Sequence, residues 1–255
     1  MSPTSEGTLP AEQLSERAAA AGLLIPVVLM LLLSAVGRAT GGSRPIALSD
    51  ATLLQGLGVE LLFMATLGFW LWRRGWRPLR TATLPFVQLD LVRALALWVS
   101  AILAVGAWAA LCRALLPGLF ESAKHTEIVG GAHFWVSLSY SVVNAVFEEL
   151  LWLGLGFAAL RRFGTTTAAT ISAGLRLLAH GYQGPLALVT VLPVAIVFTV
   201  YYVRSRRLWP VIVAHAFQDT LALSILANTG SQPIDVAAGD SAGINPLPVS
   251  RTSIE

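Results

Sequence analysis

Seven ionisable side chains lie within long apolar segments of this 255-residue chain, and their types are those of acid–base chemistry. An ionisable group inside a lipid bilayer costs about 2.5–3.5 kcal/mol on insertion scales, so such groups are rare there and mark functional sites. The seven are Glu60, Glu148, Glu149, Arg176, His180, His215 and Asp219. Six of them fall within residues 134–227, and this concentration is the main indication of function.

Helical spacing arranges most of these residues in polar stripes, because residues four apart lie on one face of a helix. The three stripes are Ser137–Ser141–Asn144–Glu148, Ser172–Arg176–His180–Gln183 and His215–Asp219. Stripes from three helices can meet inside a bundle, away from lipid. A set of carboxylates, imidazoles and one guanidinium that meets there can activate water and stabilise an oxyanion.

Two polar residues are expected to support such a site rather than to react. Glu60 stands alone in its apolar segment, so we expect it to neutralise Arg176 or another buried donor. Asn144 belongs to the first stripe, where an amide serves helix packing as readily as chemistry. The chain has neither HExxH nor HxxEH, and no spacing in it indicates a catalytic zinc, which typically has three protein ligands. We therefore expect neither a metal nor another cofactor.

Three short motifs in this region resemble those of a known family. They read Glu148-Glu149 with Leu153 after three further residues, Arg176 with His180 after three, and His215 with Asp219 after three. In order, spacing and apolar context they resemble the CAAX-processing and bacteriocin-processing (CPBP) family of intramembrane proteases, also called type II CAAX endopeptidase-like. The resemblance covers about residues 134–227.

The resemblance implies a metal-independent glutamate protease. Glu148 would be the general base, paired with His180, and would activate a water against a peptide carbonyl. His215 would donate a hydrogen bond to the oxyanion. Asp219, which cannot donate when ionised, would hold and charge His215. Glu149 points about 100° away around the helix, so it would orient a neighbour or pair with the buried arginine.

The chain departs from the family pattern at two positions. The arginine of the first motif is Leu153 here, and the phenylalanine of the second motif is Arg176. Both positions lie one turn from a site residue on their helices, so the guanidinium can be supplied from the other helix. The alternative is that the site has drifted and the protein is a pseudo-protease.

The composition indicates an all-α, polytopic membrane helix bundle. Hydrophobic residues make up 55% of the chain and charged residues only 12%, against roughly 25% in soluble domains. The mean hydropathy of +0.70 agrees. These values exclude an ordinary soluble enzyme, a disordered chain and a nucleic-acid-binding protein. The single cysteine excludes an intrachain disulfide framework.

About seven segments are long and apolar enough for membrane helices, which need about 20 residues. We predict spans at 20–37, 53–72, 92–111, 134–160, 166–183, 186–203 and 209–227. The transmembrane domain then runs over residues 20–227, with its catalytic core at 134–227. Residues 1–19 form a polar N-terminal tail, and residues 228–255 form a disordered C-terminal tail.

Loop charges predict the orientation. Eleven Arg residues fall in the loops of one side, against five Arg or Lys on the other. The positive-inside rule places the first side in the cytoplasm, with the N-terminus inside. We expect a multi-pass protein of a bacterial cytoplasmic membrane.

The leading hypothesis is an intramembrane endopeptidase that hydrolyses a peptide bond of a membrane-associated peptide or protein. A proton-coupled transporter is an alternative, since Glu, His and Asp in membrane helices also form proton relays. A catalytically inactive peptide-binding scaffold of the same fold is another. The expected partners are membrane lipids and a peptide or membrane-protein substrate, with no nucleic acid. The sequence leaves the substrate and the oligomeric state open.

Overall fold

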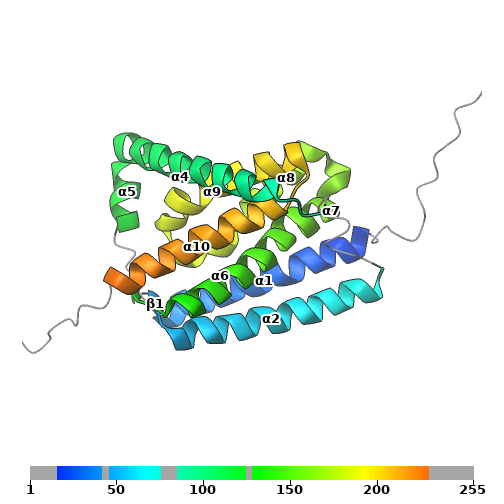
Figure 1. Cartoon of the computed structure of the whole chain (residues 1–255), viewed down its shortest axis with the longest axis horizontal. Coiled ribbons are helices and arrows are strands. Elements are labelled where there is room, and N and C mark those ends of the chain that lie inside the picture. Colours follow the sequence, from blue (N-terminus) through cyan, green and yellow to red (C-terminus); the bar gives the residue numbers. More distant parts are fainter. Residues whose placement is uncertain (1–15, 42–45, 76–84, 125–127, 230–255) are drawn as a thin grey trace, which may run out of the picture.

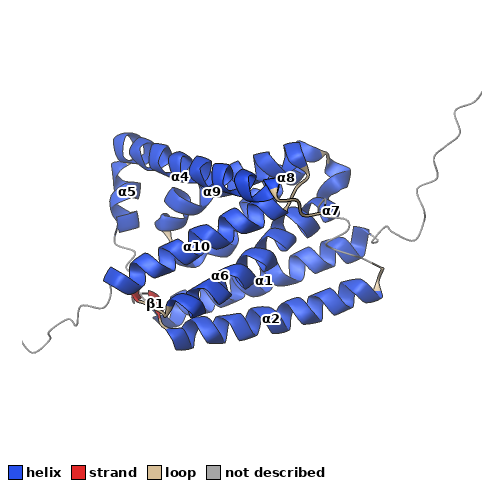
Figure 2. Ribbon diagram, viewed as in Figure 1, coloured by secondary structure: helices blue, strands red, loops and turns tan. Residues whose placement is uncertain are grey.

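Helices make up nearly all of the chain that the computed structural model describes, namely residues 16–41, 46–75, 85–124 and 128–229 (Figures 1 and 2). The α-helices are α1 (Glu16–Gly41), α2 (Asp50–Arg73), α4 (Leu89–Leu115), α5 (Pro117–Lys124), α6 (Phe134–Glu149), α7 (Gly156–Leu160), α8 (Thr165–Ala179), α9 (Pro185–Ser205) and α10 (Trp209–Thr229). Two short strands, β1 (Ile46–Leu48) and β2 (Ile128–Gly130), pair in parallel at one end of the bundle. The architecture confirms the predicted all-α polytopic membrane bundle.

Each of the seven predicted spans coincides with a helical segment. Within the described ranges, four are long and apolar enough to cross a membrane: α2, α4, α9 and the continuous run Phe134–Leu160. The run Phe134–Leu160 has the bounds predicted from the sequence. The predicted tails lie largely outside the described residues, at 1–15 and 230–255.

The fifth predicted span, residues 166–183, is not one continuous helix. Helix α8 has 15 residues and ends at Ala179, so it is about 23 Å long, less than the roughly 30 Å of a bilayer core. A 3₁₀ turn, His180–Gln183, follows it. Gly184 then adopts a φ of +59°, which favours glycine, and Pro185 begins α9. The break places His180 at a helix end rather than in mid-helix.

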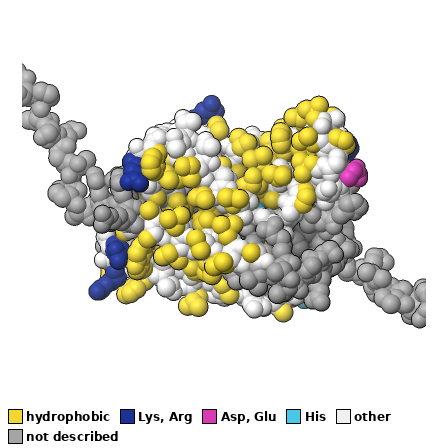
Figure 3. Space-filling model, turned by 180° about the vertical axis from the view of Figure 1, so that it is seen from behind, with side chains coloured by type: hydrophobic (Ala, Val, Ile, Leu, Met, Phe, Trp, Pro, Cys, Tyr) yellow, Lys and Arg dark blue, Asp and Glu magenta, His cyan; other side chains and the backbone are white. Residues whose placement is uncertain are grey.

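The run Phe134–Leu160 is the centre of the bundle. About 72% of its most apolar window is buried, against 6% for α2 and 17% for α4. Helix α6 packs against α10 on one side and α2 on the other, and α4 packs across α9 and α10 (Figure 1). Seen from behind, the outer surface is mostly hydrophobic, with the Lys and Arg side chains at its margin (Figure 3). The helical run Phe134–Leu160, which carries the two adjacent glutamates, is therefore the one that is most shielded from lipid.

A π-helical segment, Leu150–Leu155, directly follows the two adjacent glutamates. Such segments are rare and are frequent at functional sites. The Trp152 carbonyl accepts a hydrogen bond of 2.5 Å from the Ser172 hydroxyl, which ties this segment to α8. Gly156 permits that approach, because a Cβ there would lie 3.2 Å from the Ser172 Oγ. The π-helix thereby joins the two helices that carry most of the polar residues.

The bundle has two distinct ends. The start of α1, the end of α2 and α7 lie at the right in Figure 1, whereas β1 and the end of α10 lie at the left. The described chain thus begins and ends at opposite ends of the bundle. Which end faces the cytoplasm stays a prediction from the loop charges.

A buried acid fixes the start of α4 to the segment between α9 and α10. Asp90 is fully buried and accepts two hydrogen bonds of 2.7 Å from the Nε and Nη2 of Arg207. Arg93 Nη1 donates a third at 2.9 Å, and the Val87 backbone N–H a fourth at 3.0 Å. Two-pronged pairing of this kind gives geometric specificity as well as energy.

We predict that Asp90→Asn lowers the thermal unfolding midpoint of the purified protein by several degrees, because it leaves Arg207 without its paired charge. Arg207→Gln should have a similar effect. The matched control is Arg204→Gln, which changes an exposed arginine three residues earlier. Equal midpoints for Asp90→Asn and Arg204→Gln would contradict the assigned role.

Candidate active site

Two adjacent glutamates, an arginine and a histidine meet at the end of α6. Arg176 Nη2 donates to Glu149 Oε1 at 2.8 Å, and His215 Nδ1 lies 2.7 Å from the same oxygen. Glu149 is fully buried and Arg176 is 4% exposed. Because a carboxylate can only accept, the Nδ1–H of His215 donates to Glu149. Glu149 thus pairs with Arg176 and also orients His215.

Glu148 points to a different set of partners. Its Oε2 lies 3.5 Å from Arg176 Nη2 and accepts a hydrogen bond of 3.3 Å from Trp152 Nε1. Its Oε1 lies 3.6 Å from His180 Nε2. That separation exceeds a direct hydrogen bond, so one water molecule could bind both groups.

The backbone selects the state of His180. Its Nδ1 lies 2.9 Å from the Arg176 carbonyl oxygen, which can only accept, so Nδ1 carries the hydrogen. In the neutral ring, Nε2 then has its lone pair directed toward Glu148. The Arg176 carbonyl oxygen, which also accepts the His180 backbone N–H at the end of α8, has a second lone pair for this bond. The Tyr182 ring stacks on His180 with a centroid distance of 6.1 Å.

Helix α10 contributes a second acid–imidazole pair. Asp219 Oδ2 lies 3.3 Å from His215 Nε2 and accepts a hydrogen bond of 3.0 Å from Asn144 Nδ2. His215 thus has a carboxylate near each ring nitrogen. Only the doubly protonated imidazolium can donate to both.

Glu60 lies apart from the buried arginine. Its carboxylate accepts a hydrogen bond from the Tyr140 hydroxyl and interacts over a longer range with Glu148 and Asp219. The Arg176 guanidinium lies against Glu149, Glu148 and His215 instead. Its contact is with an uncharged donor, Tyr140, and the expectation that Glu60 supports the site stays a prediction.

The polar stripes converge only in part. Ser137 and Ser141 are fully buried, and no hydrogen-bond partner is found for either hydroxyl among the described residues. Ser172 bonds to the π-helix, and Gln183 donates to the Tyr182 hydroxyl at 3.1 Å. These four residues therefore pack or support the helices around the site.

Four aromatic residues of the site were not singled out by the sequence. Trp152 is four residues after Glu148, a spacing that could have indicated their contact. The Phe198 ring lies 5.7 Å from the Arg176 guanidinium carbon and 6.1 Å from the His215 ring. Tyr140 and Tyr182 are the other two. Aromatic residues are common in apolar spans, so the sequence carries no distinct signal for these contacts.

Leu153 is buried where the family motif has arginine. It is 1% exposed and belongs to an apolar cluster that includes Ala94, Phe198 and Val211. The Arg176 guanidinium lies over the Phe198 ring of that cluster, so both positions of the departure border the same apolar cluster. The arrangement is compatible with a guanidinium supplied from α8.

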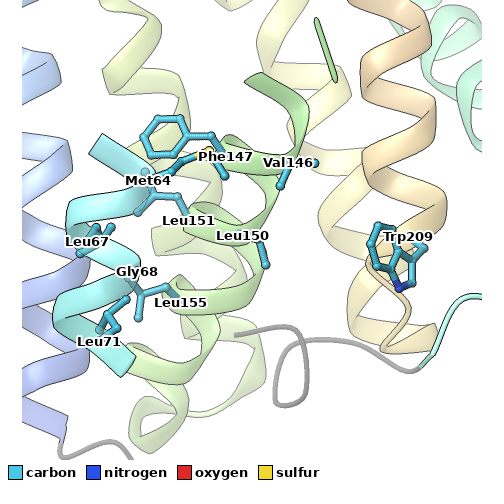
Figure 4. A pocket seen from close by; sticks show the side chains of 10 residues that line it. All are labelled: Met64, Leu67, Gly68, Leu71, Val146, Phe147, Leu150, Leu151, Leu155 and Trp209. Atoms are coloured by element: carbon cyan, nitrogen blue, oxygen red, sulfur yellow. The ribbon is translucent and has the colours of Figure 1, made fainter. Parts of the chain in front are cut away.

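An apolar groove runs behind the site, between α2, α6 and the start of α10 (Figure 4). It has a volume of about 290 Å³. Its lining residues are Met64, Leu67, Gly68, Leu71, Val146, Phe147, Leu150, Leu151, Leu155 and Trp209. None of them is an acid, a base or a nucleophile, so the groove is a neighbour of the reactive groups and not the place of reaction.

Comparison with known proteins agrees with the motifs. A family model described as Type II CAAX prenyl endopeptidase Rce1-like matches residues 129–221. No curated protein and no solved structure gives a significant match. The matched segment contains all three motifs but not Glu60. It confirms the resemblance seen in the sequence: the site-bearing segment 129–221 of this integral membrane protein is similar to the Rce1-like family of type II CAAX prenyl endopeptidases.

Proposed function

We propose that this protein is an intramembrane endopeptidase that hydrolyses a peptide bond of a membrane-associated peptide or protein with a glutamate-activated water. The observation that supports this function best is the position of Glu148. It is buried within the bundle and faces both an imidazole nitrogen and a guanidinium. The family match supplies the reaction class.

In the proposed reaction, Glu148 and His180 hold one water between them. Glu148 takes a proton as the water oxygen bonds to the peptide carbonyl carbon, and the carbonyl electron pair moves onto its oxygen. The tetrahedral intermediate then collapses, the carbon–nitrogen bond breaks, and the leaving nitrogen takes the proton from Glu148. His180 Nε2 orients the water, since Nδ1 is already committed to the Arg176 carbonyl.

Glu149 and Asp219 hold His215 in the charged form, so that its positive charge lies near the oxyanion. A cation fixed near the developing negative charge stabilises the transition state without reorganisation. The two α6 glutamates therefore have different proposed roles. Glu148 handles the proton, and Glu149 holds Arg176 and His215 in place.

We further propose that Arg176 takes the place of the arginine missing at position 153. It is the cation that lies between the two glutamates in the described part of the chain. An inactive scaffold remains the competing hypothesis, because Leu153 is packed among apolar side chains. Cleavage of a peptide library by the purified protein separates the protease from an inactive scaffold and from a transporter.

We predict that Glu148→Gln and His180→Ala each lower kcat by at least about 100-fold, the usual contribution of a general base or its partner. Peptide cleavage by purified protein in detergent is the measurement. Matched controls are Asp50→Asn and His133→Ala, an exposed acid–imidazole pair that joins the starts of α2 and α6. Turnover within tenfold of wild type for Glu148→Gln would refute the assignment.

We predict that activity survives strong chelators. The carboxylates of the site already face Arg176, His180 or His215, and no three His, Cys, Asp or Glu side chains in the described ranges are grouped to hold a metal ion. The measurement is cleavage rate after dialysis against chelator. Activity that is lost and then restored by zinc would overturn the glutamate mechanism.

We predict that Arg176→Phe alone nearly abolishes activity and lowers the unfolding midpoint. Removing one partner of a buried ion pair costs about 3–5 kcal/mol, because an uncompensated charge remains. Leu153→Arg combined with Arg176→Phe restores the family pattern, and it should recover activity and stability beyond the sum of the single changes. A double-mutant cycle of kcat/KM and midpoint measures this coupling. Additive effects would show that Arg176 does not replace the missing arginine.

A further inference from the structure

The third motif of this chain ends in an acid, Asp219, which lies beside the proposed catalytic imidazolium of His215. Hydrolysis places negative charge on the former carbonyl oxygen, and hydrogen-bond donors must meet it. Ionised Asp219 has no hydrogen to give. A side chain other than Asp219 has to supply the donor.

Asn144 is the amide that the fold brings to Asp219. It lies on α6 one turn before Glu148, whereas Asp219 lies on α10, 75 residues further along the chain. Asn144 Nδ2 donates to Asp219 Oδ2 at 3.0 Å, and the side chain is 9% exposed. A primary amide has two hydrogens on this nitrogen, and one Asp219 oxygen takes only one of them. The second hydrogen is available to a substrate.

We propose that Asn144 supplies the amide donor to the oxyanion, beside the positive charge of His215, and that Asp219 is a positioning residue that holds both groups. Asp219 Oδ2 contacts Asn144 Nδ2 at 3.0 Å and His215 Nε2 at 3.3 Å, so one oxygen sets the position of both. This inference rests on the proposed proteolytic function. It deepens that function by naming the transition-state donor.

Two other donors near Glu148 already have carboxylate partners, whereas the Arg176 Nε has no hydrogen-bond partner among the described residues. Trp152 Nε1 donates to Glu148 itself, and Arg176 Nη2 is shared by Glu148 and Glu149. The charge of Asp219 does not oppose an oxyanion at full strength, because the His215 imidazolium beside it has the opposite sign. Asn144 therefore adds a neutral donor to a site whose charges are already paired.

The first test is Asn144→Ala. Loss of one oxyanion donor lowers kcat by about 10²–10³-fold, and KM should change little because the contact forms in the transition state. The matched control is Ser141→Ala, which removes a buried hydroxyl from the same face of α6, one turn earlier. Ser141→Ala should keep kcat and the unfolding midpoint near the wild-type values.

The second test moves the amide to the other helix. Asp219→Asn alone should reduce kcat by less than tenfold. Added to Asn144→Ala, it should raise kcat at least tenfold above the single variant, since it returns an amide to the site. Asn144→Ala with Asp219→Ala should show no such recovery. A peptide aldehyde, which forms a tetrahedral adduct with water, should lose affinity in parallel with kcat.

The outcomes separate this inference from the proposed function. If the wild-type protein shows no peptide cleavage that is lost in Glu148→Gln, the proteolytic function is refuted. The inference is then refuted with it. If cleavage depends on Glu148 but Asn144→Ala keeps kcat within threefold, the function stands and the inference is overturned. Equal activity of the two double variants would also overturn it, because a purely structural Asn144 gives no advantage to an amide at position 219.

Discussion

The structure of this protein depends on burying a charged group without leaving it unpaired. Arg176 is almost fully enclosed, and it meets Glu149 at 2.8 Å and Glu148 at 3.5 Å. An isolated buried charge is strongly unfavourable, so the packed helices have to hold carboxylate partners against Arg176. The end of α6, the last turn of α8 and the middle of α10 are held together by this requirement.

Irregular helix geometry makes the arrangement possible. The π-helix Leu150–Leu155 begins directly after the glutamates, and its Trp152 both bonds to Glu148 and accepts from Ser172 on α8. Helix α8 ends at Ala179, and the Arg176 carbonyl there accepts from both the backbone N–H and the ring of His180. The site therefore uses backbone carbonyls next to these helix irregularities as acceptors for side-chain donors.

The proposed division of labour follows from charge and hydrogen-bond inventory. Glu148 has long contacts, of 3.3 to 3.6 Å, and is the carboxylate best able to exchange a proton. Glu149 has short contacts and is committed to Arg176 and His215. Asp219 gathers two donors on one oxygen. Neighbouring acids on one helix thus acquire different chemistry from the partners that each one faces.

The sequence by itself determined the helical membrane bundle, the family resemblance and the residues that lie close together at the site. These follow from hydropathy and from helical spacing, which are local properties of the chain. Only the tertiary structure decided which partner each polar group has. The sequence left Glu60 and Glu149 as alternatives for Arg176, and it gave no sign that α8 would end at Ala179 or that Asn144 would reach Asp219. Such pairings depend on the rotation and depth of one helix against another, and packing between helices sets both.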